Sequence, residues 1–162
     1  PGWKLLGEEG KGFGLMQLRL GSRRVEIAAN CIGMAQRALD LLCEYAPQRT
    51  TFGEPLSARQ TIQWWIADAQ TRIHACRLMA YDAAWKMDQG RDVRQEISML
   101  KVFATEMAWD IIDQAMQAYG AMGMTKEWPL QQMANIVRLM RIYDGPSEVH
   151  RMVIARNKLR GR

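Results

Sequence analysis

One carboxylate in this chain stands between two helical patterns, where it could carry out acid–base chemistry. Asp144 lies within residues 142–151 and is followed by Gly145 and Pro146, a pair that cannot continue a helix. The Asp144 side chain is therefore expected at a fixed backbone corner, where a carboxylate can take up or release a proton. The residues alone leave a second interpretation open, in which Asp144 only caps the helix that follows.

A second polar group, around Arg49, suits the binding of phosphate groups. Arg49 lies among threonine hydroxyls, including that of Thr51, in a loop bounded by glycine and proline. A guanidinium offers several donors in a fixed fork, which is the geometry that a diphosphate needs. Simpler roles are open for the neighbours: Gln60 could close a capping box with Ser57, and Phe52 could pack inside the loop.

Glycines mark a third segment, residues 117–123, where a long helical pattern ends. The missing side chains of Gly120 and Gly123 permit close approach of the backbone to a ligand. An ordinary glycine cap, which needs no ligand, is the alternative. The glycine-rich run at residues 10–14 is not interpreted as a dinucleotide-binding loop, because no strand pattern precedes it and no helix pattern begins there.

Helical periodicity predicts the elements that hold these segments. Apolar residues alternate in three- and four-residue steps along five stretches, which are residues 25–46, 62–87, 97–118, 130–140 and 149–153. Signals for helix ends and starts separate them: Pro47, the capping-box pattern of residues 57–60, Gly90, Asp92, Gly120, Pro129 and Pro146. No strand pattern of useful length competes. The predicted fold is all-α, an antiparallel four-helix bundle with an additional C-terminal helix packed on it.

Length and composition fit a single soluble domain. A chain of 162 residues can bury a core without metals or disulfides. Residues 1–21 are glycine-rich and carry little helical signal, so we expect a linker there and the bundle over residues 22–162. The sequence starts at Pro1, like a piece cut from a longer protein, and we expect neither a signal peptide nor a membrane span.

Cysteines, histidines and net charge narrow the possible partners. Cys31, Cys43 and Cys76 are odd in number and widely spaced, which suggests neither a disulfide framework nor a zinc site and makes a reducing cytoplasm the default location. The two histidines have no second ligand at suitable spacing, so no metal site is predicted. The formal charge of +5 indicates affinity for anions, which include nucleic acid, phospholipid and phosphate-bearing cofactors.

Ordered runs of residues resemble the C-terminal helical domain of FAD-dependent acyl-CoA dehydrogenases. The resemblance covers nearly the whole chain, and its clearest runs are residues 6–12, 33–40, 48–56 with Gln60, 66–69, 117–123 and 142–151. Members of that family also have an N-terminal helical domain and a central β domain, and neither is present here. The resemblance implies that residues 1–21 are the linker from the missing β domain.

The resemblance further implies that two segments bind FAD. In the family, four residues around one loop contact an FAD bound mainly to a neighbouring subunit, and here they are Arg49, Thr51, Phe52 and Gln60. Another segment holds the adenosine and diphosphate part, and here it is Gln117, Ala118, Tyr119, Gly120 and Ala121. Many members have a second glycine where this chain has Ala121, and we expect one methyl group to narrow that contact without abolishing it.

The same resemblance places Asp144 at the position of the catalytic base, which is Glu in many members. The implied reaction removes a proton from the α carbon of an acyl-CoA thioester, while the β hydrogen leaves as hydride to the flavin. A carboxylate enclosed by substrate and flavin loses hydration, which makes it a stronger base. Because Asp is one methylene shorter than Glu, the loop or the substrate must sit closer.

The resemblance implies roles for four further residues. Arg24 and Tyr143 are expected to contact the substrate, and Ser147 and Glu148 are expected to contact the cofactor. Tyr143 is expected to line the acyl pocket. Ser147 is expected to replace a hydroxyl that is lost because Pro146 stands where many members have Thr. Arg24 matches an arginine that lies near the base, and a solvated surface charge is its alternative.

The resemblance favours a flavin-dependent acyl-CoA dehydrogenase, and it implies that electrons pass to an electron-transferring flavoprotein and that the protein works as a homodimer or homotetramer. Most of the flavin pocket would lie in the absent domains, so the isolated chain is expected to be inactive. A non-catalytic helical module for self-association or partner binding is the alternative. Nucleic-acid binding ranks last, because the basic residues are scattered and the sequence has no evident aromatic stacking platform or recognition helix.

Overall fold

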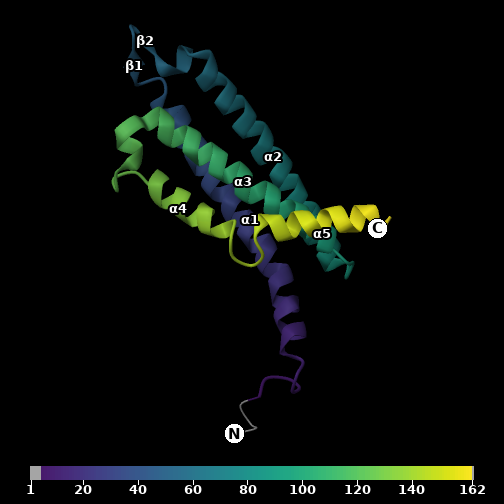
Figure 1. Ribbon diagram of the computed structural model, residues 1–162. Coiled ribbons are helices and arrows are strands. Elements are labelled where there is room, and N and C mark those ends of the chain that lie inside the picture. Colours follow the sequence, from purple (N-terminus) through teal and green to yellow (C-terminus); the bar gives the residue numbers. More distant parts are fainter. Residues whose placement is uncertain (1–4, 162) are drawn as a thin grey trace.

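The computed structural model describes residues 5–161 and has the predicted all-α fold (Figure 1). Three long helices pack with a shorter one, and their bounds are α1 (Gly12–Tyr45), α2 (Gln60–Asp88), α3 (Arg94–Tyr119) and α4 (Leu130–Met140). The additional C-terminal helix, α5 (Ser147–Leu159), lies across α3. The connections hold two short helical turns and one antiparallel pair of strands: η2 (Leu56–Ala58), η3 (Gly120–Met124), β1 (Thr50–Thr51) and β2 (Glu54–Pro55).

Helix α3 is the centre of the fold, because it packs against each of the other four helices. The apolar faces that periodicity predicted on α1 to α4 meet in one core, whose fully buried members include Leu42, Ile73, Ile111 and Val137. Removing these faces from water is the main favourable contribution to the stability of such a bundle.

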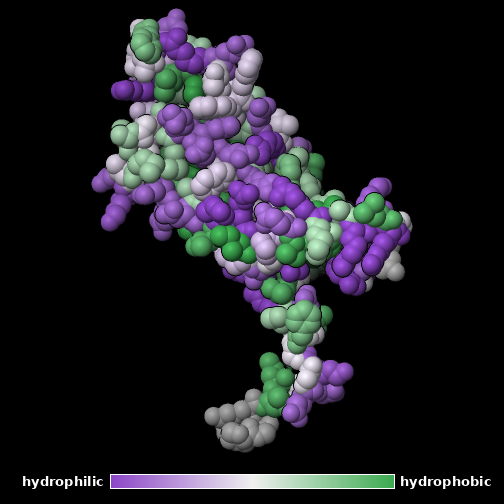
Figure 2. All heavy atoms as spheres, viewed as in Figure 1, coloured by the Kyte–Doolittle hydropathy of each residue, from purple (hydrophilic) through white to green (hydrophobic). Residues whose placement is uncertain are grey.

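The first helix begins ten residues earlier than predicted. Residues 12–21, expected in the linker, form the first turns of α1 and project from the bundle as an arm. The glycines weaken a helix locally, but strong helix formers lie between them, and extending a formed helix is far easier than starting one. The arm carries hydrophobic side chains beyond the bundle (Figure 2), with Phe13 67% and Leu18 78% exposed. Residues 1–4 of the expected linker lie outside the described residues.

The start of α2 also differs from the prediction. The N-cap is Arg59, without a side-chain cap bond, and Ser57 belongs to the preceding turn η2. The predicted capping box between Ser57 and Gln60 is therefore wrong. Ser57 lies in η2, whereas Gln60 is the first residue of α2, so the two cannot cap the same helix start. The Ser57 carbonyl instead accepts a hydrogen bond of 3.0 Å from Gln63 Nε2.

The later helices start close to their predicted signals. Asp92 Oδ1 accepts a hydrogen bond of 3.2 Å from the backbone N–H of Arg94, the first residue of α3. Pro129 and Pro146 occupy the N-cap positions of α4 and α5. Proline suits the start of a helix because its missing N–H would find no partner there.

The apolar stripe expected on α5 does not face the core. Val149 is 44% and Met152 56% exposed, whereas Ser147 and His150 are buried. The reason is that α5 packs on a polar part of α3, where Ser98 lies 3.1 Å from the His150 ring. The third predicted residue, Val153, is half-buried, so the face of α5 that meets the protein carries both polar and apolar side chains.

Candidate functional site

Asp144 stands at the corner between α4 and α5, in a backbone conformation that is rare for a residue with a side chain. Its φ angle is 55° and that of Gly145 is 99°, so both are left-handed. Pro146, and not Asp144, is the N-cap of α5, and no side chain caps that helix. The interpretation of Asp144 as a mere helix cap is therefore wrong, and its half-buried side chain is held at a corner as predicted.

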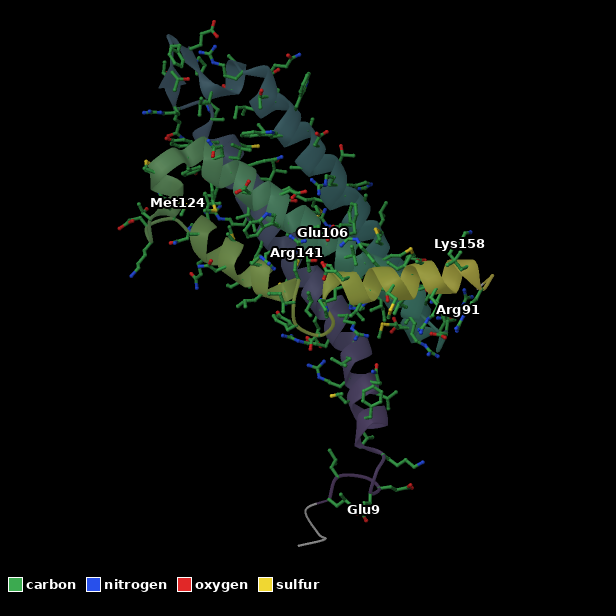
Figure 3. The ribbon with its side chains drawn as sticks, in the orientation of Figure 1. Glu9, Arg91, Glu106, Met124, Arg141 and Lys158 are labelled. Carbon is green, nitrogen blue, oxygen red and sulfur yellow. The ribbon has the colours of Figure 1, made fainter. Side chains whose placement is uncertain are left out.

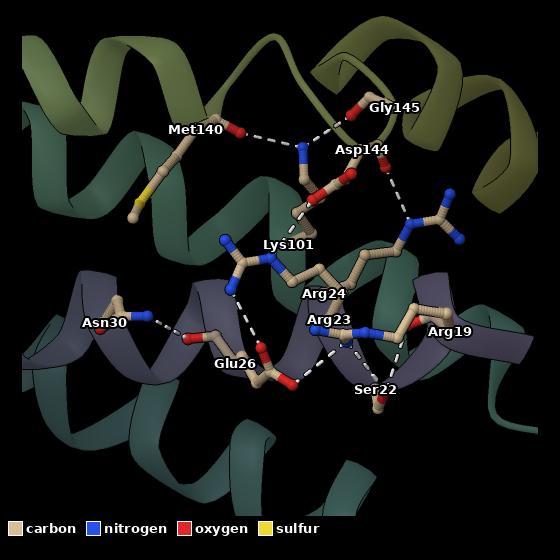
Figure 4. A network of polar contacts seen from close by, with 10 residues as sticks. All are labelled: Arg19, Ser22, Arg23, Arg24, Glu26, Asn30, Lys101, Met140, Asp144 and Gly145. Carbon is tan, nitrogen blue, oxygen red and sulfur yellow. Dashed lines mark hydrogen bonds and ion pairs between the residues drawn. The ribbon is translucent and has the colours of Figure 1, made fainter. Parts of the chain in front are cut away.

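Arg24 reaches this corner from α1. Its Nε atom donates a hydrogen bond of 2.9 Å to the backbone oxygen of Asp144 (Figure 4). Burial lowers the pKa of Arg24 and the nearby Asp144 raises it, but a guanidinium titrates so high that it remains charged. The alternative of a solvated surface charge is therefore wrong for Arg24. Arg24 therefore bonds to the backbone of Asp144 and not to its carboxylate.

The carboxylate itself pairs with Arg23, to which the sequence analysis gave no role. Arg23 Nε lies 3.6 Å from Asp144 Oδ2, and Arg23 Nη1 lies 3.0 Å from Glu26 Oε2 (Figure 4). The hydrogen bond to Glu26 is the largest of the effects that raise the pKa of Arg23. One guanidinium thus bridges two carboxylates. The signal in the sequence was a doublet of arginines on one helix, of which only one was assigned.

Lys101 is a second residue that the sequence analysis missed. It is 1% exposed in the first third of α3, and its Nζ atom donates hydrogen bonds of 2.9 Å to Met140 O and 2.6 Å to Gly145 O. Burial is the main cause that lowers the pKa of Lys101 to about 8, and the positive charge of Arg24 adds to it. A lysine on the buried stripe of a helix, between Leu100 and Ala104, was the signal in the sequence.

His150 lies under the corner and is 2% exposed. Its Nδ1 atom is 3.1 Å from Ser98 Oγ. Burial first, and then the positive charges of Arg24 and Lys101, lower the pKa of His150 to about 4, so the ring is neutral at neutral pH. A Cβ atom at Gly145 would lie 2.9 Å from His150 Nε2, and this close approach together with the positive φ explains the glycine.

Ion pairs tie both sides of the corner to α3. Glu106 Oε1 lies 3.5 Å from Arg141, the first residue after α4, and the other carboxylate oxygen pairs with Arg151 of α5. Figure 3 shows Glu106 and Arg141 next to each other where these helices meet. The segment that carries Asp144 is therefore fixed at both ends to the central helix.

A groove of about 640 Å³ runs beside the corner. Arg24 and His150 line it, together with apolar side chains of the α1 arm and of α5, such as Phe13 and Val149. Tyr143, expected in an acyl pocket, is half-buried against the core, where Arg23 and Asp144 influence its pKa, which burial chiefly raises. The groove offers an apolar wall beside the positive charge of Arg24, whose Nε atom bonds to the backbone of Asp144.

A separate cleft of about 510 Å³ lies at the other end of the bundle. It brings together two segments that are far apart in the sequence and that were both predicted to bind the cofactor. The predicted residues that line it are Arg49, Thr51, Gln117, Ala118, Tyr119, Gly120 and Ala121. Leu56, Ile62 and Trp65 add an apolar surface. The cleft combines a flat apolar wall with an arginine and a hydroxyl, as a nucleotide requires.

Two predicted residues lie outside the set that lines this cleft. Phe52 is 100% exposed at the tip of the β1–β2 hairpin, with φ of 50°, so packing within the loop is ruled out. Gln60 is the exposed first residue of α2 and forms no cap bond. Both side chains point away from the chain itself, so any ligand that they touch must approach from outside.

The glycines near the cleft have different roles. Gly120 ends α3 with φ of 61° and ψ of −138°, a conformation that essentially only glycine adopts, and it faces the cleft. A Cβ atom at Gly123 would lie 2.8 Å from Met116 O, so that glycine serves internal packing and not ligand approach. The Tyr119 hydroxyl donates to Leu41 O at 3.1 Å, and its ring stacks on Tyr45 with the centroids 4.2 Å apart, so this side chain is held within the bundle at the base of the cleft.

Unsatisfied polar groups at both ends of the bundle fit a bound FAD. Ser147 Oγ is buried, and among residues 5–161 it has no hydrogen-bond partner, so a group from outside would satisfy it. The Arg49 guanidinium makes no ion pair within the described chain and stands at the edge of the cleft. Glu148 is exposed in the first turn of α5, next to Ser147. These three residues are among those that the family resemblance predicts for the cofactor.

The two predicted groups of site residues lie far apart on one chain. Lys101 at the corner and Gln117 at the cleft are sixteen positions apart on α3, which corresponds to about 24 Å along the helix.

Within residues 5–161, no helix is long and apolar enough to cross a membrane. In the same range no group of three or more His, Cys, Asp or Glu side chains could hold a metal ion.

Known proteins share this fold. Residues 10–159 match the family described as "Acyl-CoA dehydrogenase, C-terminal domain". The (R)-benzylsuccinyl-CoA dehydrogenase of Thauera aromatica is 44% identical over 96% of this chain and 38% of its own length. The butyryl-CoA dehydrogenase from Megasphaera elsdenii superimposes with a TM-score of 0.90 and 34% identity, over 98% of this chain and 42% of that one. The structure of PigA with FAD and proline superimposes with a TM-score of 0.89 and 32% identity, over 96% of this chain and 41% of that one.

All-α architecture, an acidic corner and these matches define the class of protein. The chain belongs to the acyl-CoA dehydrogenase family, as its C-terminal helical domain. It spans about two fifths of the length of the relatives that it matches, 38% and 42% for the two dehydrogenases.

Proposed function

We propose that this chain is part of an enzyme that desaturates an acyl-CoA thioester, with Asp144 as the catalytic base. The observation that carries the proposal is the left-handed, half-buried Asp144 at a corner braced by Arg24 and Lys101, in a chain of this family. The carboxylate takes the α proton, and the electrons of that C–H bond form the Cα–Cβ double bond. FAD, when bound, accepts the β hydrogen with its electron pair as hydride.

The groove beside the corner is proposed to receive the substrate. Arg24 lines it and can place a positive charge near the thioester, whose oxygen gains negative charge as the proton leaves. The apolar wall of the groove excludes water, which strengthens the attraction between Arg24 and that oxygen. Tyr143 is proposed to close the acyl pocket when the domains that this chain lacks are present.

The cleft at the opposite end is proposed to serve a second FAD, bound mainly to a neighbouring subunit. Arg49 and Thr51 would hold its diphosphate, the residues from Gln117 to Ala121 its adenosine part, and Phe52 and Gln60 its outer face. Ser147 and Glu148 would contact the chain's own FAD. The distance between corner and cleft supports this division, which in turn requires a homodimer or homotetramer.

Three further properties belong to the same proposal. Electrons would leave the reduced enzyme through an electron-transferring flavoprotein. The isolated chain would be inactive, because it spans about two fifths of its relatives. A cytoplasmic location would suit the buried thiols of Cys31 and Cys76, whose pKa burial raises to about 12.

The test uses the full-length protein. It should be yellow as purified, and an acyl-CoA from a panel that includes butyryl-CoA and (R)-benzylsuccinyl-CoA should bleach its flavin absorption without oxygen. Bound flavin that no acyl-CoA bleaches would favour the alternative, a non-catalytic helical module for self-association or partner binding. A salt-sensitive complex with DNA and no flavin would favour nucleic-acid binding.

A further inference from the structure

Backbone oxygens of the corner between α4 and α5 converge on two cationic side chains. Met140 O belongs to the last residue of α4, where helix carbonyls have no partner within the helix. Lys101 donates to Met140 O and to Gly145 O, and Arg24 donates to the oxygen of Asp144 between them (Figure 4). Within residues 5–161, Lys101 is the one donor found for each of its two oxygens.

Lys101 is an unusual choice for this place if stability is its purpose. It is 1% exposed, and among the described residues its ammonium forms no salt bridge with a carboxylate. Removing an ammonium from water is costly, and an apolar residue of similar volume is often as good or better for stability. The side chain also has high rotational entropy, which is lost on burial. A role other than stability explains the lysine better.

The contacts of Lys101 define that role. They fix the chain four residues before Asp144 and immediately after it. Asp144 is thereby held with φ of 55°, a region that side chains disfavour and that persists only where the surroundings over-determine it. We propose that Lys101 is a positioning residue, which holds the backbone on both sides of Asp144 so that the carboxylate faces the reacting carbon. This inference rests on the proposed role of Asp144 as base.

The position of Lys101 on α3 makes the restraint rigid. Helix α3 packs against all four other helices, so Lys101 is attached to the central element of the fold. The Thr105 hydroxyl bonds back to Lys101 O at 2.9 Å, one turn farther along the helix. A displacement of a reacting group by about 1 Å can cost on the order of 100-fold in rate. Because Lys101 touches only backbone oxygens, its loss should affect the proton transfer and leave substrate binding nearly unchanged.

Three variants of the full-length flavoprotein test this. Lys101→Met removes every donor and keeps an unbranched side chain of similar length. Lys101→Gln keeps an N–H donor but no charge. Lys86→Met is the matched control, because Lys86 is paired with Asp82 and Glu96, away from the corner. The rate of flavin bleaching at saturating butyryl-CoA or (R)-benzylsuccinyl-CoA and the substrate Kd are measured separately in a stopped-flow instrument.

The expected result is a bleaching rate about 30- to 100-fold lower in Lys101→Met, with a Kd within about threefold of the wild type. Lys101→Gln should recover part of the rate, and Lys86→Met should bleach like the wild type. A Lys101→Met protein that binds flavin and bleaches within twofold of the wild-type rate would overturn the proposal. Loss of flavin from both Lys101 variants would also count against it, since a purely structural role predicts that.

The same measurements separate this proposal from the function on which it depends. If the wild type does not bleach, the proposed function fails and the role of Lys101 fails with it. If the wild type bleaches, Asp144→Asn does not, and Lys101→Met bleaches normally, only the role of Lys101 is refuted.

Discussion

Arg23 Nε lies 3.6 Å from Asp144 Oδ2, so the carboxylate that we propose as the base is already paired with a cation. The pair is half-exposed, and Arg23 also bonds to Glu26. Such pairs are weak in water and break easily. A base that is held in this way is kept in place between turnovers, but it must leave Arg23 before it reaches the substrate.

Removing Arg23 should therefore speed the reaction modestly. In full-length Arg23→Gln, we expect the bleaching rate at saturating acyl-CoA to rise about two- to fivefold, which corresponds to the free energy of a surface ion pair. Arg19→Gln is the control, because Arg19 pairs with Glu26 but not with Asp144. A rate that falls tenfold would mean that Arg23 assists the chemistry.

Gly145 should not tolerate a side chain. Gly145→Ala places a Cβ atom 2.9 Å from His150 Nε2, at a φ of 99°, and we expect it to lower the free energy of unfolding of the chain by about 2 kcal/mol or more. Gly33→Ala, in α1 with open space around it, should raise that free energy by about 0.5–1 kcal/mol. Urea titration of both variants measures the difference, and equal effects would contradict the geometry of the corner.

Stability should fall with acid because His150 is buried as a neutral ring. Its pKa is about 4 in the folded chain against 6.5 unfolded, so the unfolded state binds more protons between these values. The full contribution is present above pH 6.5, and it is lost as the pH falls toward 4, at most about 3 kcal/mol. His150→Gln should flatten this part of the curve of unfolding free energy against pH, and His74→Gln, at an exposed position, should not.

Arg49 should matter for flavin binding and not for the fold. In the full-length protein, Arg49→Gln is expected to weaken FAD binding by about 10- to 100-fold, the value of a hydrogen bond to a charged group. Arg37→Gln, whose loss removes only a surface pair with Glu44 at 3.9 Å, is the control. The flavin content after dialysis gives the measurement. Equal content in both variants would remove Arg49 from the site.

The helices could be predicted because each carries a repeating apolar face, and burial follows that face wherever two faces can meet. The start of α1 could not, since glycines in residues 12–21 lower helix propensity locally while the rest of a 34-residue helix supports extension. The prediction that the apolar stripe of α5 faces the core was wrong for another reason. Val149 and Met152 have the right spacing, but α5 turns the buried Ser147 and His150 inward, and His150 meets Ser98 of α3.

The candidate site could be predicted only in part. Asp144 at its Gly-Pro break, the Arg49 loop and the segment from Gln117 to Ala121 could each be found from a motif within one segment, whereas the meeting of the last two in one cleft could not. Lys101 and Arg23 come from other helices, and only packing brings them to Asp144. A pattern within one segment does not predict such contacts between helices. A lysine on the buried stripe of a helix nevertheless indicates that some polar partner must meet it there.

The most direct test of the central claim is the rate at which an acyl-CoA bleaches the flavin of full-length Asp144→Asn, compared with the wild type. Asn has nearly the shape of Asp but cannot take up the α proton, and loss of a general base costs about 100- to 10,000-fold. We predict a loss of this size with the flavin still bound. Bleaching of the Asn variant at the wild-type rate would contradict the account.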